Sequence, residues 1–181
     1  TTAELQSPIG LIMDEAPSDC ISDLPESPYL PLDRAHREIR LLELEPGAFD
    51  DDLVMSLRIK RIGKKRPRYE ALSYVWGKEM CPDKALLNGR RVAIGRNLDC
   101  ALRHIRQIAA DLLPGEQRLL WVDALCINQD NIVERNQQVQ FMDSIYSSAS
   151  KVVVWLGPER EDTQYILEKI QEGKLPDTVE D

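Results

Sequence analysis

Residues Leu119–Leu156 read LLWVDALCINQDNIVERNQQVQFMDSIYSSASKVVVWL, and this stretch decides the fold. Residues 119–122 and 152–156 are short apolar runs, typical of strands in a parallel sheet covered on both sides. Between them, apolar residues recur at helical spacing. They are Val139, Met142, Ile145, Tyr146 and Ala149. The stretch therefore predicts a strand–helix–strand crossover, and such units are normally right-handed.

The remaining chain adds elements to this unit. Residues 70–75 predict a further core strand, and residues 98–112 predict an amphipathic helix for which Asn97 would be the N-cap. Together these segments predict a three-layer α/β domain of the TIR or flavodoxin type. Its mainly parallel sheet would be flanked by helices, with strands 70–75, 119–123 and 152–156 at its centre. The last of these strands would form an exposed edge unless something covers it.

Two β-hairpins are expected as additions to this core. One spans about 39–61, where alternating apolar residues follow a Pro-Gly break. The other lies near 85–94, because Asn88-Gly89 supplies the two positive φ angles of a type I′ turn.

Composition narrows the classes of function. The chain has 181 residues, 43% hydrophobic and 30% charged, with a net charge of −8, which does not favour general nucleic-acid binding. Its four cysteines lie far apart without a CxxC pair, so neither a metal site nor a disulfide framework is expected. No apolar run approaches the ~18 residues of a membrane span, and no signal peptide is visible. These features predict a cytoplasmic protein.

Three parts of the chain are distinguished by composition. Residues 1–37 form an acidic, proline-rich arm, 38–158 form the domain, and 159–181 form a helix and tail that we expect to lead into a longer protein. Seven basic residues lie between Arg58 and Arg68. They could bind phosphates, acidic lipid or nucleic acid, but the absence of interleaved aromatic residues favours a solvated strand end.

Three segments resemble the HET domain, the heterokaryon incompatibility domain of filamentous fungi. They are YEALSYVWG at 69–77, LWVDALCINQ at 120–129 and ERNQQVQFMDSIYSSASKVVVWLG at 134–157. Asn88-Gly89 and NLDCAL at 97–102 fit the same spacing. The resemblance implies a role in fungal non-self recognition, in which the domain induces cell death.

The resemblance leaves two functional hypotheses. The domain would act as a death-inducing signalling module, through self-association or by recruiting other cell-death proteins. Alternatively, it would hydrolyse NAD, because HET domains are similar in layout to TIR domains and some TIR domains cleave NAD. This second step is an analogy between folds. No GxGxxG or P-loop is present, so neither a Rossmann dehydrogenase nor an NTPase is supported. No cofactor is predicted, and NAD would be a substrate in the second hypothesis.

Candidate site residues follow the strand that ends at Val122. Asp123 could hold a ribose or accept a proton, or it could satisfy backbone N–H groups in the turn. Asn128 and Gln129 could bind a polar ligand or simply form the turn. Glu134 fits a capping box with Asn131 as N-cap, and it could also stabilise a developing cation.

Other candidates lie nearby in the predicted fold. Arg135 could bind a phosphate or pair with an acid. Ser73 and Trp76 follow the 70–75 strand, where Trp76 could stack on a base or fill the edge of the core. Ser73 is a poor nucleophile, because only His36 and His104 could serve as its base and neither falls in a motif. His104 also lies on the predicted outer side of its helix. The similarity to TIR domains implies a catalytic glutamate in the region after the third core strand. Here that region offers Glu161, together with Glu159 and Asp162, but no motif aligns any of them with it.

Overall fold

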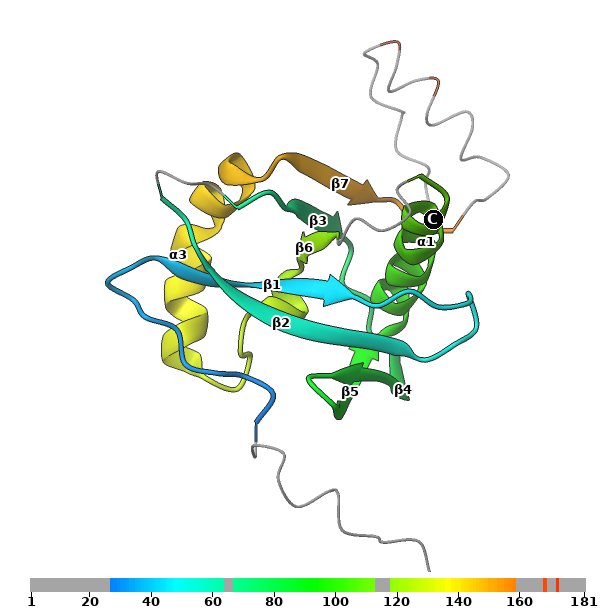
Figure 1. Ribbon diagram of the computed structural model, residues 1–181, viewed down its shortest axis with the longest axis horizontal. Helices are drawn as coiled ribbons and strands as arrows, with labels where there is room; N and C mark the ends of the chain where they lie inside the picture. The colour runs from blue at the N-terminus through cyan, green and yellow to red at the C-terminus, as the bar shows by residue number, and fades with distance from the viewer. Residues whose placement is uncertain (1–26, 64–66, 113–117, 159–167, 169–171, 173–181) are drawn as a thin grey trace, which may run out of the picture.

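The computed structural model describes residues 27–63, 67–112 and 118–158, together with Glu168 and Glu172. Within this part of the chain there are seven strands and three helices (Figure 1). In chain order they are β1 (Glu38–Leu44), β2 (Leu53–Arg61), β3 (Glu70–Tyr74), β4 (Met80–Leu87), β5 (Arg90–Gly95), α1 (Arg96–Leu112), β6 (Leu119–Trp121), α2 (Asp123–Cys126), α3 (Ile132–Ser148) and β7 (Lys151–Trp155).

All seven strands join one mixed sheet in the order β5-β4-β2-β1-β6-β3-β7. β3 pairs in parallel with β6 and β7, and β2 pairs in parallel with β4. β1 is antiparallel to both β2 and β6, and β4 is antiparallel to β5. The prediction of a mainly parallel sheet is therefore wrong. The β1–β2 hairpin is not an addition either, because β1 occupies the middle of the sheet and is buried from Ile39 to Glu43.

β7 is an edge strand of the described sheet, so the expectation that it would lie at the centre is wrong. Its side chains alternate between half-buried Val153 and Trp155 and exposed Val152 and Val154. The apolar run at 152–156 indicated a strand covered on both sides, but only one face of β7 packs against the core. The expectation that this strand would be an exposed edge is met within the described residues.

The register of β3 shows where the two long helices lie. Trp121 of β6 pairs with Ala71, and Trp155 of β7 pairs with Tyr74. Because Ala71 and Tyr74 are three positions apart in one strand, they and their partners point to opposite faces. A tyrosine ring of α3 packs against Trp121 at 5.5 Å between centroids, whereas a histidine ring of α1 packs against Trp155 at 5.0 Å. Hence α1 and α3 cover opposite faces, with β3 and β6 between them (Figure 1).

Of three local predictions about turns and helix starts, two are confirmed and one is wrong. Asn88 and Gly89 both have positive φ, at 49° and 79°, as the predicted type I′ turn requires. Asn131 is the N-cap of α3 and accepts a hydrogen bond from the Glu134 N–H. Asn97, predicted as the N-cap of α1, lies inside the helix, and its side chain bonds Val75 and Trp155 instead.

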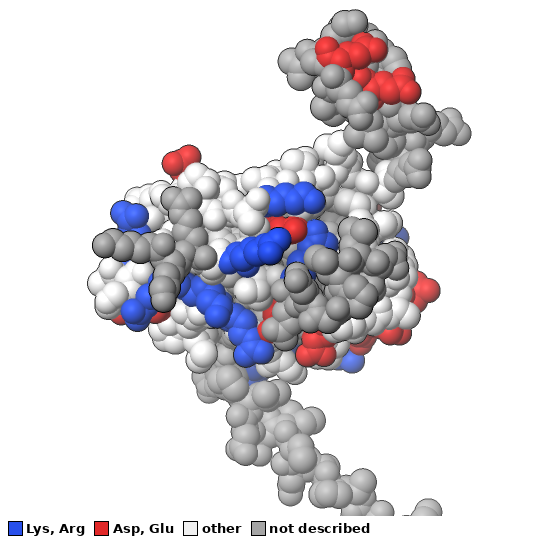
Figure 2. Space-filling view, turned by 45° about the horizontal axis from the view of Figure 1, so that its top comes forward, with Lys and Arg blue, Asp and Glu red and all other residues white. Residues whose placement is uncertain are grey.

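Basic residues follow β2 toward its end. Arg58 pairs with Glu43 at 2.7 Å and Arg61 with Glu38 at 3.1 Å, so two of the seven bases neutralise carboxylates of the neighbouring strand. Figure 2 shows a band of Lys and Arg side chains across one face of the molecule. Residues 64–66 of this segment lie outside the described part of the chain. The pairings support the interpretation of a solvated strand end.

Candidate functional site

A group of polar side chains gathers at the carboxyl ends of β3 and β6, and we call Tyr74, Trp76, Asp123 and Gln129 the strand-end cluster. The two strands are parallel neighbours, so their carboxyl ends meet at one edge of the sheet. The Trp76 indole N–H donates to Asp123 Oδ2 at 3.1 Å across 47 positions of sequence. The Gln129 amide donates to the Asp123 carbonyl oxygen at 3.0 Å. Trp76, Asp123 and Gln129, which the sequence suggested as site residues, therefore lie together.

Opposing effects act on the Asp123 carboxylate. Its partial burial raises its pKa, while hydrogen bonds from the Ala124 N–H, the Trp76 indole and the Tyr74 hydroxyl lower it, and burial prevails. The Ala124 N–H donates to Oδ1 at 2.7 Å. The pKa of Tyr74 is raised in turn, first by burial and then by the negative charge of Asp123. The cluster thus holds a hydrogen-bonded carboxylate whose ionisation is disfavoured, an arrangement that recurs at functional sites.

Trp76 presents its ring to solvent while its N–H is fixed. It is 58% exposed, so it does not fill the edge of the core. A ring that is anchored at one edge and open on its surface can stack on a planar group without losing much conformational freedom. Tyr74, which the sequence had not suggested as a site residue, could have been found from its position next to the Ser73 candidate on β3.

Ser73 lies elsewhere. It is half-buried in β3, pairs with Val154 and points to the face opposite Tyr74. His104 packs on the other face, between Phe49 and Trp155, and its Nδ1 lies 2.8 Å from the Cys100 carbonyl oxygen. The expectation that His104 lies on the outer side of its helix is thus wrong. The two side chains stand on opposite faces of the sheet, so His104 is not placed to act as a base for Ser73.

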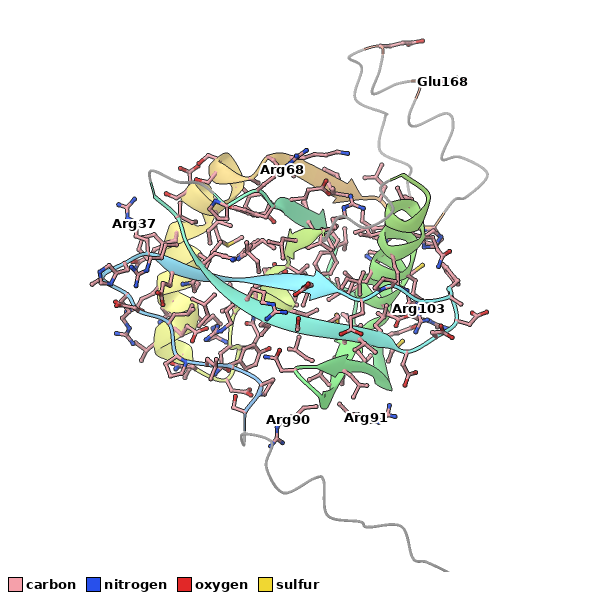
Figure 3. All side chains as sticks on the ribbon, in the orientation of Figure 1. Arg37, Arg68, Arg90, Arg91, Arg103 and Glu168 are labelled. Carbon is pink, nitrogen blue, oxygen red and sulfur yellow. The ribbon has the colours of Figure 1, made fainter. Side chains whose placement is uncertain are left out.

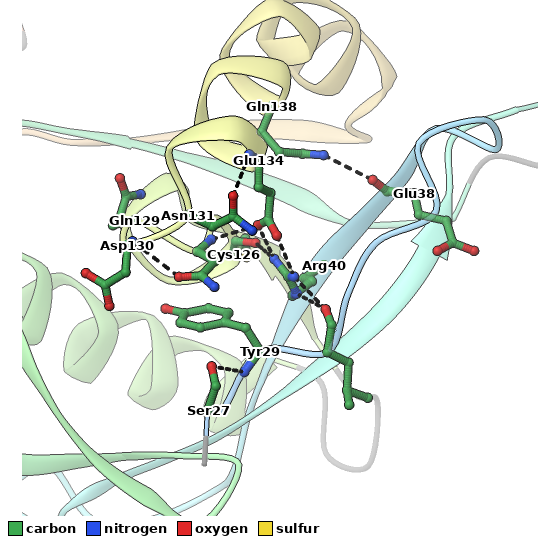
Figure 4. Close-up of polar contacts among 12 residues, drawn as sticks. Ser27, Tyr29, Glu38, Arg40, Cys126, Gln129, Asp130, Asn131, Glu134 and Gln138 are labelled. Atoms are coloured by element: carbon green, nitrogen blue, oxygen red, sulfur yellow. Dashed lines mark hydrogen bonds and ion pairs between the residues drawn. The ribbon is translucent and has the colours of Figure 1, made fainter. Parts of the chain in front are cut away.

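Glu134 belongs to a second cluster, centred on Arg40 (Figure 4). Arg40 is 1% exposed and Glu134 is 8% exposed, and the guanidinium donates to both carboxylate oxygens, at 2.5 Å and 3.0 Å. The Asn128 N–H also donates to Glu134 at 2.8 Å. Burial alone would raise the pKa of Glu134, but the hydrogen bonds from Arg40 and from the Asn128 N–H hold it below its ordinary value.

The capping-box interpretation of Glu134 is therefore half right. Asn131 accepts from the Glu134 N–H at 3.1 Å, as the motif requires. The Glu134 carboxylate does not return to Asn131, because it is held by Arg40 and Asn128. Sequence reasoning missed Arg40, although an arginine within an apolar strand is a signal for a buried partner.

The remaining guanidinium donors of Arg40 tie three segments together. Nε and Nη2 donate to the Leu30 carbonyl at 3.2 Å and 2.6 Å, and Nη1 donates to the Cys126 carbonyl at 3.1 Å. The guanidinium also lies 5.1 Å from the centre of the Tyr29 ring. These contacts describe a structural joint between the N-terminal segment, β1 and the start of α3 rather than an open reaction centre.

The other candidates fall outside both clusters. Arg135 is exposed on α3, and Glu161, Glu159 and Asp162 lie outside the described residues. In the part of the chain that the structure describes, no group of three His, Cys, Asp or Glu side chains is placed to hold a metal ion. None of the helices described there is long and apolar enough to cross a membrane.

Comparison with known proteins identifies the family. The family model "Heterokaryon incompatibility protein (HET)" matches residues 69–180. The chain is 38% identical over 147 residues to "Heterokaryon incompatibility protein 6, OR allele" of Neurospora crassa, an alignment that covers 74% of this chain and 21% of that protein. The chain thus spans about a fifth of the length of this relative. No solved structure matches. The chain belongs to the heterokaryon incompatibility (HET) family.

Proposed function

We propose that this domain is a death-inducing signalling module of fungal non-self recognition, acting through induced proximity. Its membership of the HET family is the observation that carries this proposal. Proximity would come from self-association of the domain or from other cell-death proteins that gather several copies. The net charge of −8 opposes spontaneous association, so contact between copies would require that they first be concentrated.

The β7 edge, comprising Lys151–Trp155 and Leu156, supports self-association. Natural edge strands are usually guarded by charges, prolines or bulges, whereas β7 carries three consecutive valines and one charge, Lys151. Val152, Val154 and Leu156 are all exposed. If two copies pair antiparallel about Val153, Val152 of each copy faces Val154 of the other on the same side of the joined sheet. The edge is thus complementary to itself.

Forced dimerisation in fungal cells tests this proposal. We expect a domain fused to a chemically induced dimeriser to become toxic only when the inducer is added. Val152→Lys with Val154→Lys should abolish toxicity, because it places lysines opposite each other across the paired edges. Val133→Lys with Val139→Lys is the matched control, since these valines are similarly exposed on α3. Toxicity from a form shown to be monomeric by sedimentation would contradict the proposal.

A second candidate function is NAD hydrolysis at the strand-end cluster, favoured by the Trp76–Asp123 hydrogen bond. Here Trp76 would stack on a base of the dinucleotide. The bond between the nicotinamide nitrogen and ribose C1′ would break with its electron pair leaving on nicotinamide, and Asp123 would stabilise the cation formed on the ribose. Water would add to C1′ and release a proton. Glu134 is a weaker choice for this role because Arg40 already neutralises it.

Release of nicotinamide from NAD tests this second function. Purified domain, free and artificially clustered, would be incubated with NAD, and Asp123→Asn and Trp76→Leu compared with the wild type. Asp143→Asn, an exposed change on α3, is the control. We expect Asp123→Asn to lower the rate at least about tenfold, because it removes a charge that acts in the transition state. No release by the clustered wild type, or full activity in Asp123→Asn, would show this assignment to be wrong.

A further inference from the structure

A cavity of about 250 Å³ lies beside the Arg40–Glu134 joint, away from the strand-end cluster. Its walls come from three segments: residues 31–34 before β1, the start of β1, and the N-terminal half of α3. Neither functional hypothesis uses it. Its lining includes Arg34 and Arg37, the amide side chains of Asn131, Gln137 and Gln140, and the ring of Phe141.

The side chains that line this cavity carry an excess of positive charge. Two carboxylates line it, but each already has a basic partner: Glu134 binds Arg40, and Glu38 binds Arg61. The cations of the lining, Arg34 and Arg37, form no ion pair within the described residues. Arg34 also helps to lower the pKa of the Glu134 carboxylate, but Glu134 is already bound by Arg40, so Arg34 and Arg37 give this hollow an excess of positive charge that suits an anion.

The backbone of Arg37 adopts a strained conformation. Its φ is +51°, in the left-handed region that non-glycine residues rarely adopt. Its guanidinium carbon lies 5.9 Å from the centre of the Phe141 ring, a cation–π arrangement that fixes the side chain against α3. Figure 3 shows Arg37 at the rim of the molecule beside this helix. Backbone strain of this kind is concentrated at ligand sites, where it keeps a binding group in position.

Amide groups supply the rest of the lining. The Asn131 Oδ1 is occupied by the Glu134 N–H, which leaves its amide N–H groups as donors. Gln138 donates to the Glu38 carbonyl at 3.2 Å and is already committed, whereas Gln137 and Gln140 lie more exposed along the same wall. Primary amides both donate and accept, so they suit hydroxyl groups better than apolar or purely ionic ligands.

The volume of the cavity limits the size of the ligand. Its volume of about 250 Å³ lies just below the ~300 Å³ at which pockets for drug-sized ligands begin, so the cavity suits a small ligand. We propose that this cavity binds a compact phosphorylated polyol of pentose phosphate size, with its phosphate on Arg34 and Arg37 and its hydroxyls on the amides.

Calorimetric titration of the whole chain with ribose 5-phosphate tests the proposal, with ribose, inorganic phosphate and AMP as comparison ligands. We expect saturable binding of ribose 5-phosphate, no binding of ribose, and weaker binding of inorganic phosphate. AMP should bind more weakly as well, because its base exceeds a ligand of pentose phosphate size, and tighter binding of AMP would contradict the proposed size of the ligand.

Arg34→Gln with Arg37→Gln should weaken binding of ribose 5-phosphate at least about tenfold, because two charge-assisted contacts are lost. Arg135→Gln removes a charge from the same end of α3 outside the cavity, and it should change affinity less than about twofold. Thermal unfolding checks that the variants fold. Absence of saturable binding, equal binding of inorganic phosphate, or an unchanged affinity in the double variant would overturn the proposal.

Discussion

Arg40 and Glu134 stand 94 positions apart in the sequence and meet as a buried ion pair joined by two hydrogen bonds. The pair links the central strand β1 to the first turn of α3. Its remaining hydrogen-bonding capacity is taken by backbone groups at Leu30, Cys126 and Asn128. A buried pair satisfied in this way is strongly destabilising to break from one side, because the remaining charge is left without a partner.

Glu134→Gln should therefore lower the free energy of unfolding by about 3 kcal/mol. The amide keeps the shape of the side chain but leaves the buried Arg40 charge unneutralised. Urea unfolding followed by circular dichroism measures the change. Asp143→Asn, an exposed change on the same helix, should leave the free energy unchanged within error. A loss in Glu134→Gln no larger than in this control would show that the pair contributes little.

The contribution of Glu134 to the free energy of unfolding should also depend on pH. Its pKa is lower in the folded protein than in the unfolded chain, so the stability that it contributes is present above its unfolded pKa of about 4.3 and is lost as the pH falls through its folded value. The difference in unfolding free energy between wild type and Glu134→Gln should thus be constant near neutral pH and shrink in acid. A difference that stays constant down to the acid transition would contradict this sign.

The effect of Asp123 on stability should depend on pH in the opposite direction. Burial raises its pKa in the folded state, so ionisation of this carboxylate disfavours folding as the pH rises through that value. We expect Asp123→Asn to keep or raise the melting temperature at pH 7, with no difference from wild type below the unfolded pKa of about 3.9. The single amide oxygen can still accept from one of the two donors, the Trp76 indole or the Ala124 N–H. Destabilisation at pH 7 would indicate that the carboxylate has a structural role in the turn.

Asn88 joins three segments, and two substitutions separate its roles. Its side chain accepts from the Leu57 N–H at 2.9 Å and donates to the Pro28 carbonyl at 2.7 Å, while its φ is positive. Asn88→Gly keeps the backbone conformation and should lose about 1–2 kcal/mol through the hydrogen bonds. Asn88→Ala should lose roughly 1 kcal/mol more, because alanine is strained at positive φ. Equal losses in thermal unfolding would show that the turn conformation contributes nothing measurable.

Local patterns in the sequence predicted most elements and some of the site. The Asn88-Gly89 turn, the long helices and the strand ends that unite Trp76 with Asp123 all follow from short-range signals. The one-turn helix α2 was not foreseen, because residues 123–130 read as a polar turn although Leu125 and Cys126 are buried.

The pairing of strands could not be read from the same patterns. A hairpin such as β1–β2 has the same sequence signature whether it lies at the edge of a sheet or in its middle. Its insertion beside β6 depends on long-range packing, with Arg40 bound to Glu134 on the distant helix α3. The valines of β7 likewise resemble a covered strand, since β-branched residues suit edge and central strands alike. The domain boundary at residue 38 stays a prediction; in the structure Tyr29 and Leu30, which precede it, contact Arg40.

The way in which residues 28–30 are attached has an evolutionary consequence. Arg40 holds Leu30, and Asn88 holds Pro28, in both cases through main-chain carbonyl oxygens, which every amino acid possesses. The Leu30 side chain itself points to solvent. Relatives can therefore diverge at these positions while the path of the chain stays the same, provided that the arginine and the asparagine are kept. Inheritance of this joint would be visible as two invariant positions, one in β1 and one in the turn between β4 and β5, with no matching similarity in the segment that they hold.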